Sequence, residues 1–193
     1  VRYDTLNSSF RPSSGFQSIF LQELPLLSDG YSIINGYQVT GYKEILEDSV
    51  LSMGIYTRAI NSLDSNKDAR VSKRMFLPSS KLRGFEAGKI GPKDGLDYVG
   101  GNYMASFNTA LTLPYLFSNY DNVDFSIFFD AANVWHVDYS KQVDQSNSIR
   151  SATGIGLSVI TPVGPLSFSL SQPITKADGD AEETVRFNIG TTF

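Results

Sequence analysis

The stretch Leu166-Ser167-Phe168-Ser169-Leu170-Ser171 alternates strictly between a large apolar residue and a serine. Successive side chains of a β-strand point to opposite faces of its sheet, so this period of two predicts a strand with one apolar and one polar face. The residues Pro162-Val163-Gly164-Pro165 directly before it predict a tight turn. The fold of the chain therefore depends on what covers each of these two faces.

The same alternation recurs along the chain between turn-forming residues. After the tail of a strand near Val1, it predicts eight strands, at 15–24, 32–46, 50–60, 101–113, 123–132, 149–160, 166–171 and 184–193. Short turns alternate with generally longer loops, which lie at 26–32, 61–98, 136–148 and 173–183. Short turns at one end of the strands and long loops at the other are typical of bacterial transmembrane β-barrels.

The composition is compatible with an all-β membrane protein. Aromatic residues make up 12% of the 193 residues, glycine occurs 16 times, and the mean hydropathy is −0.14. No apolar run approaches the roughly 18 residues of a membrane helix, but a barrel strand needs only about 9–11 residues with one apolar face. The net charge of −4 argues against nucleic acid as a partner, and the lack of cysteine excludes disulfides.

A soluble β-sandwich is the alternative to a membrane barrel, because its strands also carry one apolar and one polar face. Two features favour the membrane. The polar faces are rich in serine, glycine, threonine and asparagine rather than lysine and glutamate, as in a barrel lumen. Aromatic residues also cluster near the predicted strand ends, as in an interfacial girdle, at Tyr31, Tyr98, Tyr115, Phe117, Tyr120, Trp135 and Tyr139.

The loop at 61–98 is unusually long for a connection without its own secondary structure. It carries half of the 16 lysines and arginines of the chain, at Lys67, Arg70, Lys73, Arg74, Lys81, Arg83, Lys89 and Lys93. We expect this loop to bend back into a wide lumen and to present a fixed cation there, with its other basic residues solvated rather than bound to lipopolysaccharide phosphates. Because eight strands enclose only enough space for their own side chains, the working barrel must be larger.

The loop contains Leu82-Arg83-Gly84-Phe85, followed by Gly91-Pro92, and later come Phe128-Phe129-Asp130 and a terminal Phe187-Asn188-Ile189-Gly190 ending at Phe193. Together these motifs resemble the barrel-assembly and polypeptide-transport superfamily of outer-membrane proteins, and most closely its BamA-like assembly factors. The resemblance implies a barrel of about sixteen strands, of which residues 1–193 are the C-terminal half. It also implies that POTRA domains are absent here and that the chain is a fragment, in keeping with an N-terminus without a visible signal peptide.

The resemblance further implies that Arg83 is tied to the barrel wall through Asp130. The residues themselves establish only opposite charges and an inward-facing Asp130, which suit a bidentate ion pair. A solvated loop arginine is the alternative. Within the motif, Leu82 and Phe85 accompany a Gly84 that supplies a backbone conformation which other residues resist, and Phe85 is expected to pack on the lumen wall. Ala110 stands where some relatives carry a further carboxylate.

The last predicted strand resembles the C-terminal signal of barrel proteins. Phe187, Ile189 and Phe193 would anchor it, and Gly190 would weaken its pairing at the seam with the first strand of the barrel. A weak seam would expose backbone N–H and C=O groups that could template an incoming strand.

These inferences predict a protein that assembles and inserts β-barrel proteins and is itself integral to the bacterial outer membrane. Expected partners are unfolded outer-membrane barrel substrates, accessory assembly lipoproteins, membrane lipid and lipopolysaccharide. A polypeptide-secreting transporter of the same superfamily and a small passive or structural barrel are the alternatives. No enzyme activity, metal or cofactor is expected, because His136 and Ser140 lack a third orienting group.

Overall fold

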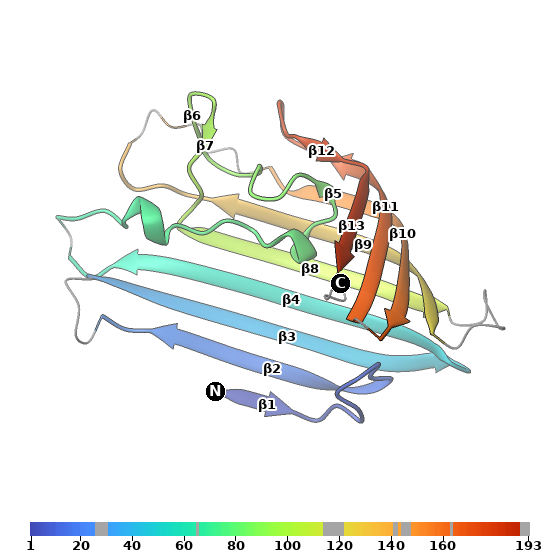
Figure 1. Ribbon diagram of the computed structural model, residues 1–193. Coiled ribbons are helices and arrows are strands. Elements are labelled where there is room, and N and C mark those ends of the chain that lie inside the picture. The colour runs from blue at the N-terminus through green and yellow to red at the C-terminus, as the bar shows by residue number, and fades with distance from the viewer. Residues whose placement is uncertain are drawn as a thin grey trace.

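The computed structural model describes residues 1–25, 31–64, 66–113, 122–140, 143, 148–162 and 164–189. Its main feature is one curved antiparallel sheet of nine strands (Figure 1). In order across the sheet, these strands are β1 (Arg2–Asp4), β2 (Ser14–Glu23), β3 (Ser32–Leu46), β4 (Ser49–Ser62), β8 (Tyr103–Leu113), β9 (Val123–Trp135), β10 (Arg150–Thr161), β11 (Gly164–Thr175) and β13 (Val185–Ile189).

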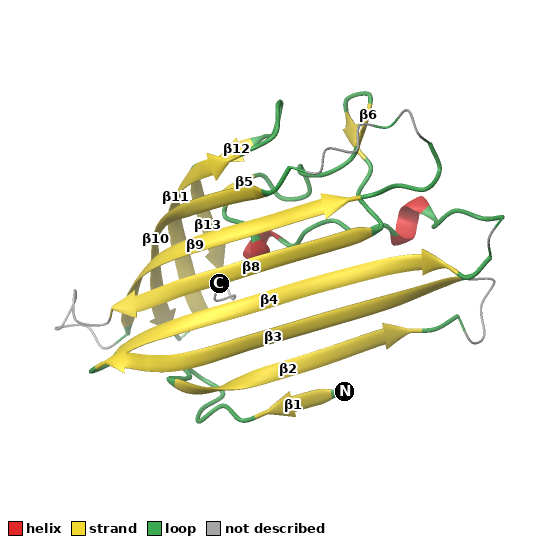
Figure 2. Ribbon diagram, turned by 180° about the vertical axis from the view of Figure 1, so that it is seen from behind, coloured by secondary structure: helices red, strands yellow, loops and turns green. Residues whose placement is uncertain are grey.

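Each inner strand pairs with the strands of the sheet that precede and follow it in the sequence, as in a meander (Figure 2). Within the described residues, β1 and β13 form the two edges. The eight predicted strands and the short strand near Val1 are all present, with ends displaced by up to four residues where both ends are described. The sheet thus has the topology expected of part of an antiparallel β-barrel.

The two faces of the sheet have the reverse polarity of those in a soluble protein. On β9 the side chain of Ile127 is 48% exposed, whereas its inward neighbours Phe128 and Asp130 are almost fully buried. On β11 Phe168 and Leu170 are exposed, whereas the serines between and beside them, at 167, 169 and 171, are buried. An outward apolar face and an inward polar face are expected when lipid covers the outside, so the β-sandwich alternative is not supported.

We expect Ile127→Lys to destabilise the folded barrel by about 2–4 kcal/mol, because it places a charge on the lipid face near the middle of a strand. Val123→Lys, at the start of the same strand, should cost about 0–1 kcal/mol, since that position lies nearer the interface. Urea unfolding of the whole protein in lipid vesicles would measure both free energies. Equal effects of the two substitutions would contradict a membrane-facing outer surface.

Short elements occupy the connections at one end of the sheet. The segment 61–98 contains the 3₁₀ turns η1 (Val71–Lys73) and η2 (Ser79–Lys81) and the strands β5 (Gly84–Phe85), β6 (Lys93–Asp94) and β7 (Asp97–Tyr98). The connection after β11 contains β12 (Glu182–Glu183), where the sequence predicts a loop. Among the described residues, no helix has the length and apolar character that a membrane crossing requires.

Candidate functional site

The segment 61–98 lies within the curve of the sheet, where it forms an apolar core with the inner wall (Figure 1). Buried residues of the segment meet buried residues of five strands of the sheet. The segment contributes Ala69, Met75, Leu77, Leu82, Phe85 and Ile90, and the wall contributes Ile34, Ile60, Met104, Ala132, Val134 and Ala152. A segment that buries this much apolar surface is docked on the wall rather than solvated.

The structure places Arg83 and Asp130 in direct contact on the concave face. Arg83 Nε donates to Asp130 Oδ2 at 2.7 Å, and Arg83 Nη2 donates to Asp130 Oδ1 at 2.8 Å. The backbone N–H of Arg83 also donates to Oδ2, at 3.1 Å. The side chains are 5% and 0% exposed, respectively. The pair is therefore a buried bidentate ion pair with an added backbone hydrogen bond, and not the solvated arginine of the alternative.

Neighbouring side chains complete the surroundings of this pair. Asn108 Nδ2 donates to Asp130 Oδ1 at 2.8 Å and to the backbone oxygen of Lys81 at 3.0 Å. The guanidinium carbon of Arg83 lies 3.4 Å from the ring centre of Phe128, in a cation–π contact. Gly154 pairs with Phe128 in the sheet, and a Cβ atom there would lie 2.7 Å from the Phe128 ring. The wall thus provides a carboxylate and a ring for the cation, and Asn108 holds the carboxylate in place.

The backbone at Gly84 explains why the motif needs a glycine. Its φ is +89°, and a Cβ atom at this position would lie 2.9 Å from Cβ of Ala152 on β10. Gly84 and Phe85 then pair as β5 with Glu183 and Glu182 of β12. The motif is therefore fixed by close contact with the wall and by a short strand addition. The sequence motif does not reveal this pairing, because two-residue strands have no periodicity.

A second arginine, on the terminal strand, also contacts the motif. The guanidinium of Arg186 on β13 donates to the backbone oxygens of Ser79, Leu82 and Phe85 and to the carboxylate of Glu183. The alternation of the last predicted strand, 184–193, indicates only that Arg186 lies on the polar face of that strand. Its contact with the motif could have been expected in general terms, because a charged side chain that faces inward from a barrel wall requires a partner.

A third buried arginine fixes the connection that carries β12. Arg150, at the start of β10, donates from Nε and Nη2 to the two carboxylate oxygens of Asp180, at 2.9 and 3.1 Å. Its Nη1 donates to Asn133 Oδ1 and to the backbone oxygen of Ser148, both at 2.8 Å. Asp180 lies two residues before β12, so this pair positions the strand that pairs with the motif.

The expectation that the other basic residues of the segment are solvated is wrong for Arg74. Its side chain is 1% exposed. The guanidinium carbon lies 4.1 Å from the ring centre of Tyr139, and Nη2 lies 3.5 Å from Oδ1 of Asp138. Lys81 is half-buried over the ring of Tyr56, and burial lowers its pKa while nearby Asp130 opposes that change. Lys89 fits the expectation, with an exposed ion pair to Glu86.

The predicted residues of the terminal strand are only partly described. Phe187 and Ile189 lie on the exposed outer face, and the ring of Phe187 packs 4.5 Å from that of Phe168 on β11. Gly190 and Phe193 lie outside the described residues, as do Tyr115, Phe117 and Tyr120 of the expected aromatic girdle. His136 stacks on the ring of Tyr103 with 5.3 Å between ring centres.

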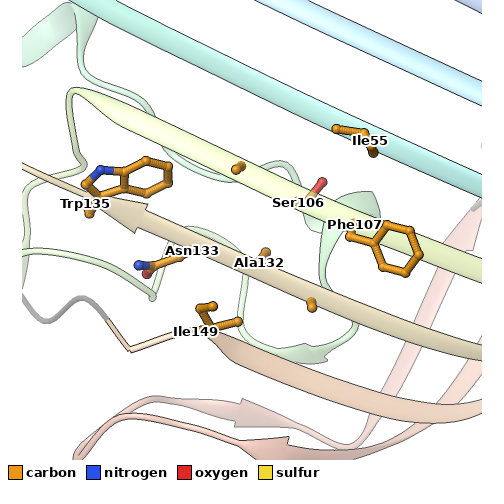
Figure 3. A pocket seen from close by; sticks show the side chains of 9 residues that line it. Ile55, Ser106, Phe107, Ala132, Asn133, Trp135 and Ile149 are labelled. Carbon is orange, nitrogen blue, oxygen red and sulfur yellow. The ribbon is translucent and has the colours of Figure 1, made fainter.

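A hollow of about 560 Å³ lies on the opposite, outer face of the sheet (Figure 3). Small residues on β8 and β9 form its floor. Larger side chains border it, namely Phe107 and Trp135 of the same two strands, Ile55 of β4 and Ile149 just before β10. The hollow is separated from the Arg83–Asp130 pair by the sheet itself. It is a feature of the apolar exterior and not part of the candidate site.

Comparison with known proteins gives a consistent result. The model of the Omp85 superfamily domain matches residues 1–193. "Outer membrane protein assembly factor BamA" of Neorickettsia risticii is 26% identical over 161 residues, which are 81% of this chain and 21% of that protein. The "SAM50-like protein" of Schizosaccharomyces pombe is 28% identical over 154 residues, 74% of this chain and 31% of that protein.

The fold is also found in a solved structure. The crystal structure of BamA from Haemophilus ducreyi lacking POTRA domains 1–3 matches with a TM-score of 0.86 and 30% identity, and the match covers 100% of this chain and 41% of that one. This chain therefore spans less than half the length of each of these relatives.

Proposed function

Since this chain belongs to the Omp85 superfamily, we propose that it forms the part of a barrel assembly factor that docks the loop motif Leu82–Phe85 and presents the terminal strand. The chain is part of an integral outer-membrane β-barrel. The activity that we propose for the whole protein is the assembly and insertion of other β-barrel proteins into the outer membrane. The relative from Neorickettsia risticii, which is named as an outer membrane protein assembly factor, supports this proposal.

The observation that carries the proposal is the buried Arg83–Asp130 pair. A passive barrel wall needs no such device, because burying two charges is costly unless their geometry is nearly ideal. Here the pair fixes a 38-residue segment, 61–98, across the inner wall, at a point that also contacts the terminal strand. An assembly factor can use that arrangement to hold its edge strand in one place while a client strand pairs with it.

The proposed mechanism uses hydrogen bonding and folding rather than chemical catalysis. A strand edge presents a row of backbone N–H and C=O groups, and an unfolded client strand can pair with it. The energy would come from the client's own folding in lipid, where every backbone group needs a hydrogen-bond partner. Accessory assembly lipoproteins and lipopolysaccharide would act on the whole protein around this step.

Conditional depletion of the whole protein in its own cell tests the proposed function. Quantitative proteomics of the outer membrane should then show a general loss of β-barrel proteins. Loss of one exported polypeptide, with normal levels of other barrels, would instead identify a transporter of the same superfamily. A normal barrel content together with reduced solute permeability, measured by liposome swelling, would identify a passive pore.

We expect Arg83→Lys to slow the insertion of an unfolded barrel protein into vesicles that contain the whole protein by about tenfold, because lysine keeps the charge but loses the bidentate geometry. The matched control is Lys89→Arg, a basic substitution in the same segment at an exposed ion pair. Such surface pairs contribute little, so this variant should insert clients at the parental rate. Equal rates for all three proteins would contradict a role of the ion pair in insertion.

A further inference from the structure

Arg186 on the terminal strand contacts the loop motif, and all five of its N–H donors are used. A guanidinium has five N–H donors. Nε donates to a carboxylate oxygen of Glu183 at 2.8 Å, and Nη1 donates to the backbone oxygens of Ser79 and Leu82, the latter at 3.2 Å. Nη2 donates to the backbone oxygen of Phe85 and to Glu183. These are five hydrogen bonds from one buried side chain.

The acceptors of Arg186 are backbone oxygens on both sides of Arg83. Leu82 precedes Arg83, and Phe85 follows it by two residues. Arg186 therefore binds the backbone on both sides of Arg83, whose side chain pairs with Asp130. Lysine has three donors and glutamine two, and neither has the planar fork that reaches several acceptors at once. The site therefore requires arginine for its geometry and not only for its charge.

The two contacts lie on strands that are not neighbours. Asp130 is on β9 and Arg186 is on β13, and β10 and β11 lie between them in the sheet. Three strand spacings correspond to about 14 Å along the sheet. The motif crosses this distance on the inner face, where Gly84 passes close to Ala152 on β10 and to Ser171 on β11. The motif thus connects the four strands β9, β10, β11 and β13 across the inner face of the sheet.

We propose that Arg186 is a positioning residue that couples the loop motif to the terminal strand, so that β13 and the turn at 79–86 loosen together or not at all. Only the consequence of this coupling rests on the proposed function: release of the motif would free the edge strand for pairing with a client. The coupling itself is a property of the folded barrel. It can be measured without any client protein.

Amide hydrogen exchange of the whole protein in lipid nanodiscs tests the coupling. Arg186→Gln should raise exchange about tenfold or more in peptides covering both 79–86 and 185–189, because hydrogen bonds to a charged donor are lost at both places. Arg186→Lys should give a smaller increase in the same two segments. Lys89→Gln, which removes an exposed charge from the same loop, should leave both segments unchanged.

A second variant tests the coupling from the other end. Asp130→Asn weakens the ion pair that holds the motif on β9, and it leaves Arg186 and its strand unchanged. It should nevertheless raise amide exchange at 185–189 on β13, which is separated from β9 by β10 and β11. If Arg186→Gln changes only 185–189, or if Asp130→Asn leaves 185–189 unchanged while 79–86 exchanges faster, the coupling does not exist. Because exchange is measured without a client, this result is independent of whether the protein inserts barrels.

Discussion

Asp130→Ala is expected to destabilise the docked state of the segment 61–98 by about 3–5 kcal/mol, because it leaves the buried guanidinium of Arg83 without its counter-charge. The carboxylate accepts three hydrogen bonds from Arg83 and one from Asn108, and its side chain is fully buried. Undocking exposes the basic residues of the segment. Faster trypsin cleavage within 61–98, in a barrel that otherwise stays folded, would measure the effect.

A paired substitution separates the charge from the packing. The double variant Arg83→Met with Asp130→Leu removes both charges and keeps apolar volume, and such replacements of buried ion pairs are often neutral for stability. We expect it to be much less sensitive to trypsin than Asp130→Ala. Were the double variant as sensitive as the single one, loss of packing and not an unpaired charge would explain the undocking.

Gly84→Ala is expected to destabilise docking by about 3 kcal/mol, the combined cost of a strained backbone and an overpacked contact. The new Cβ atom would lie 2.9 Å from Cβ of Ala152, at a residue whose φ is +89°. The effect should appear as faster trypsin cleavage of the segment and slower client insertion, measured on the same preparations.

Gly95→Ala is the matched control for that substitution. Gly95 also has a positive φ, +63°, but a Cβ atom there would meet nothing within 4 Å. Its cost should therefore be limited to the backbone, about 1 kcal/mol. If Gly95→Ala and Gly84→Ala were equally damaging, the close approach between the motif and β10 would have no part in docking.

The strands of this fold could be predicted from the sequence because each one carries its signal locally. The alternation of Leu166 to Ser171 separates the residues of β11 into an apolar and a polar face, without reference to any other strand. The polarity of the two faces was favoured by the serine, glycine, threonine and asparagine on the polar face, although the inner wall also carries apolar residues such as Ile60 and Val134 under the segment 61–98. The ends of the strands were less well predicted, and β11 continues to Thr175, where the residues no longer alternate.

The candidate site could be predicted only in part. Opposite charges at Arg83 and Asp130 follow from the residues, whereas their contact was an expectation from family resemblance. The contacts of Arg150 with Asp180 and of Arg186 with the motif were missed, because they join residues 30 and about 100 positions apart. Both arginines nevertheless stand at inward positions in walls of small residues, where a buried charge requires a partner.

The three serines of β11 have a consequence for the wall that the segment covers. Among the described residues, the hydroxyls of Ser169 and Ser171 are buried without a hydrogen-bond partner, which costs about 1–3 kcal/mol for each group. Water would satisfy both hydroxyls as soon as the segment moved away. Wetting of this surface would thus offset part of the packing that is lost if the segment undocks.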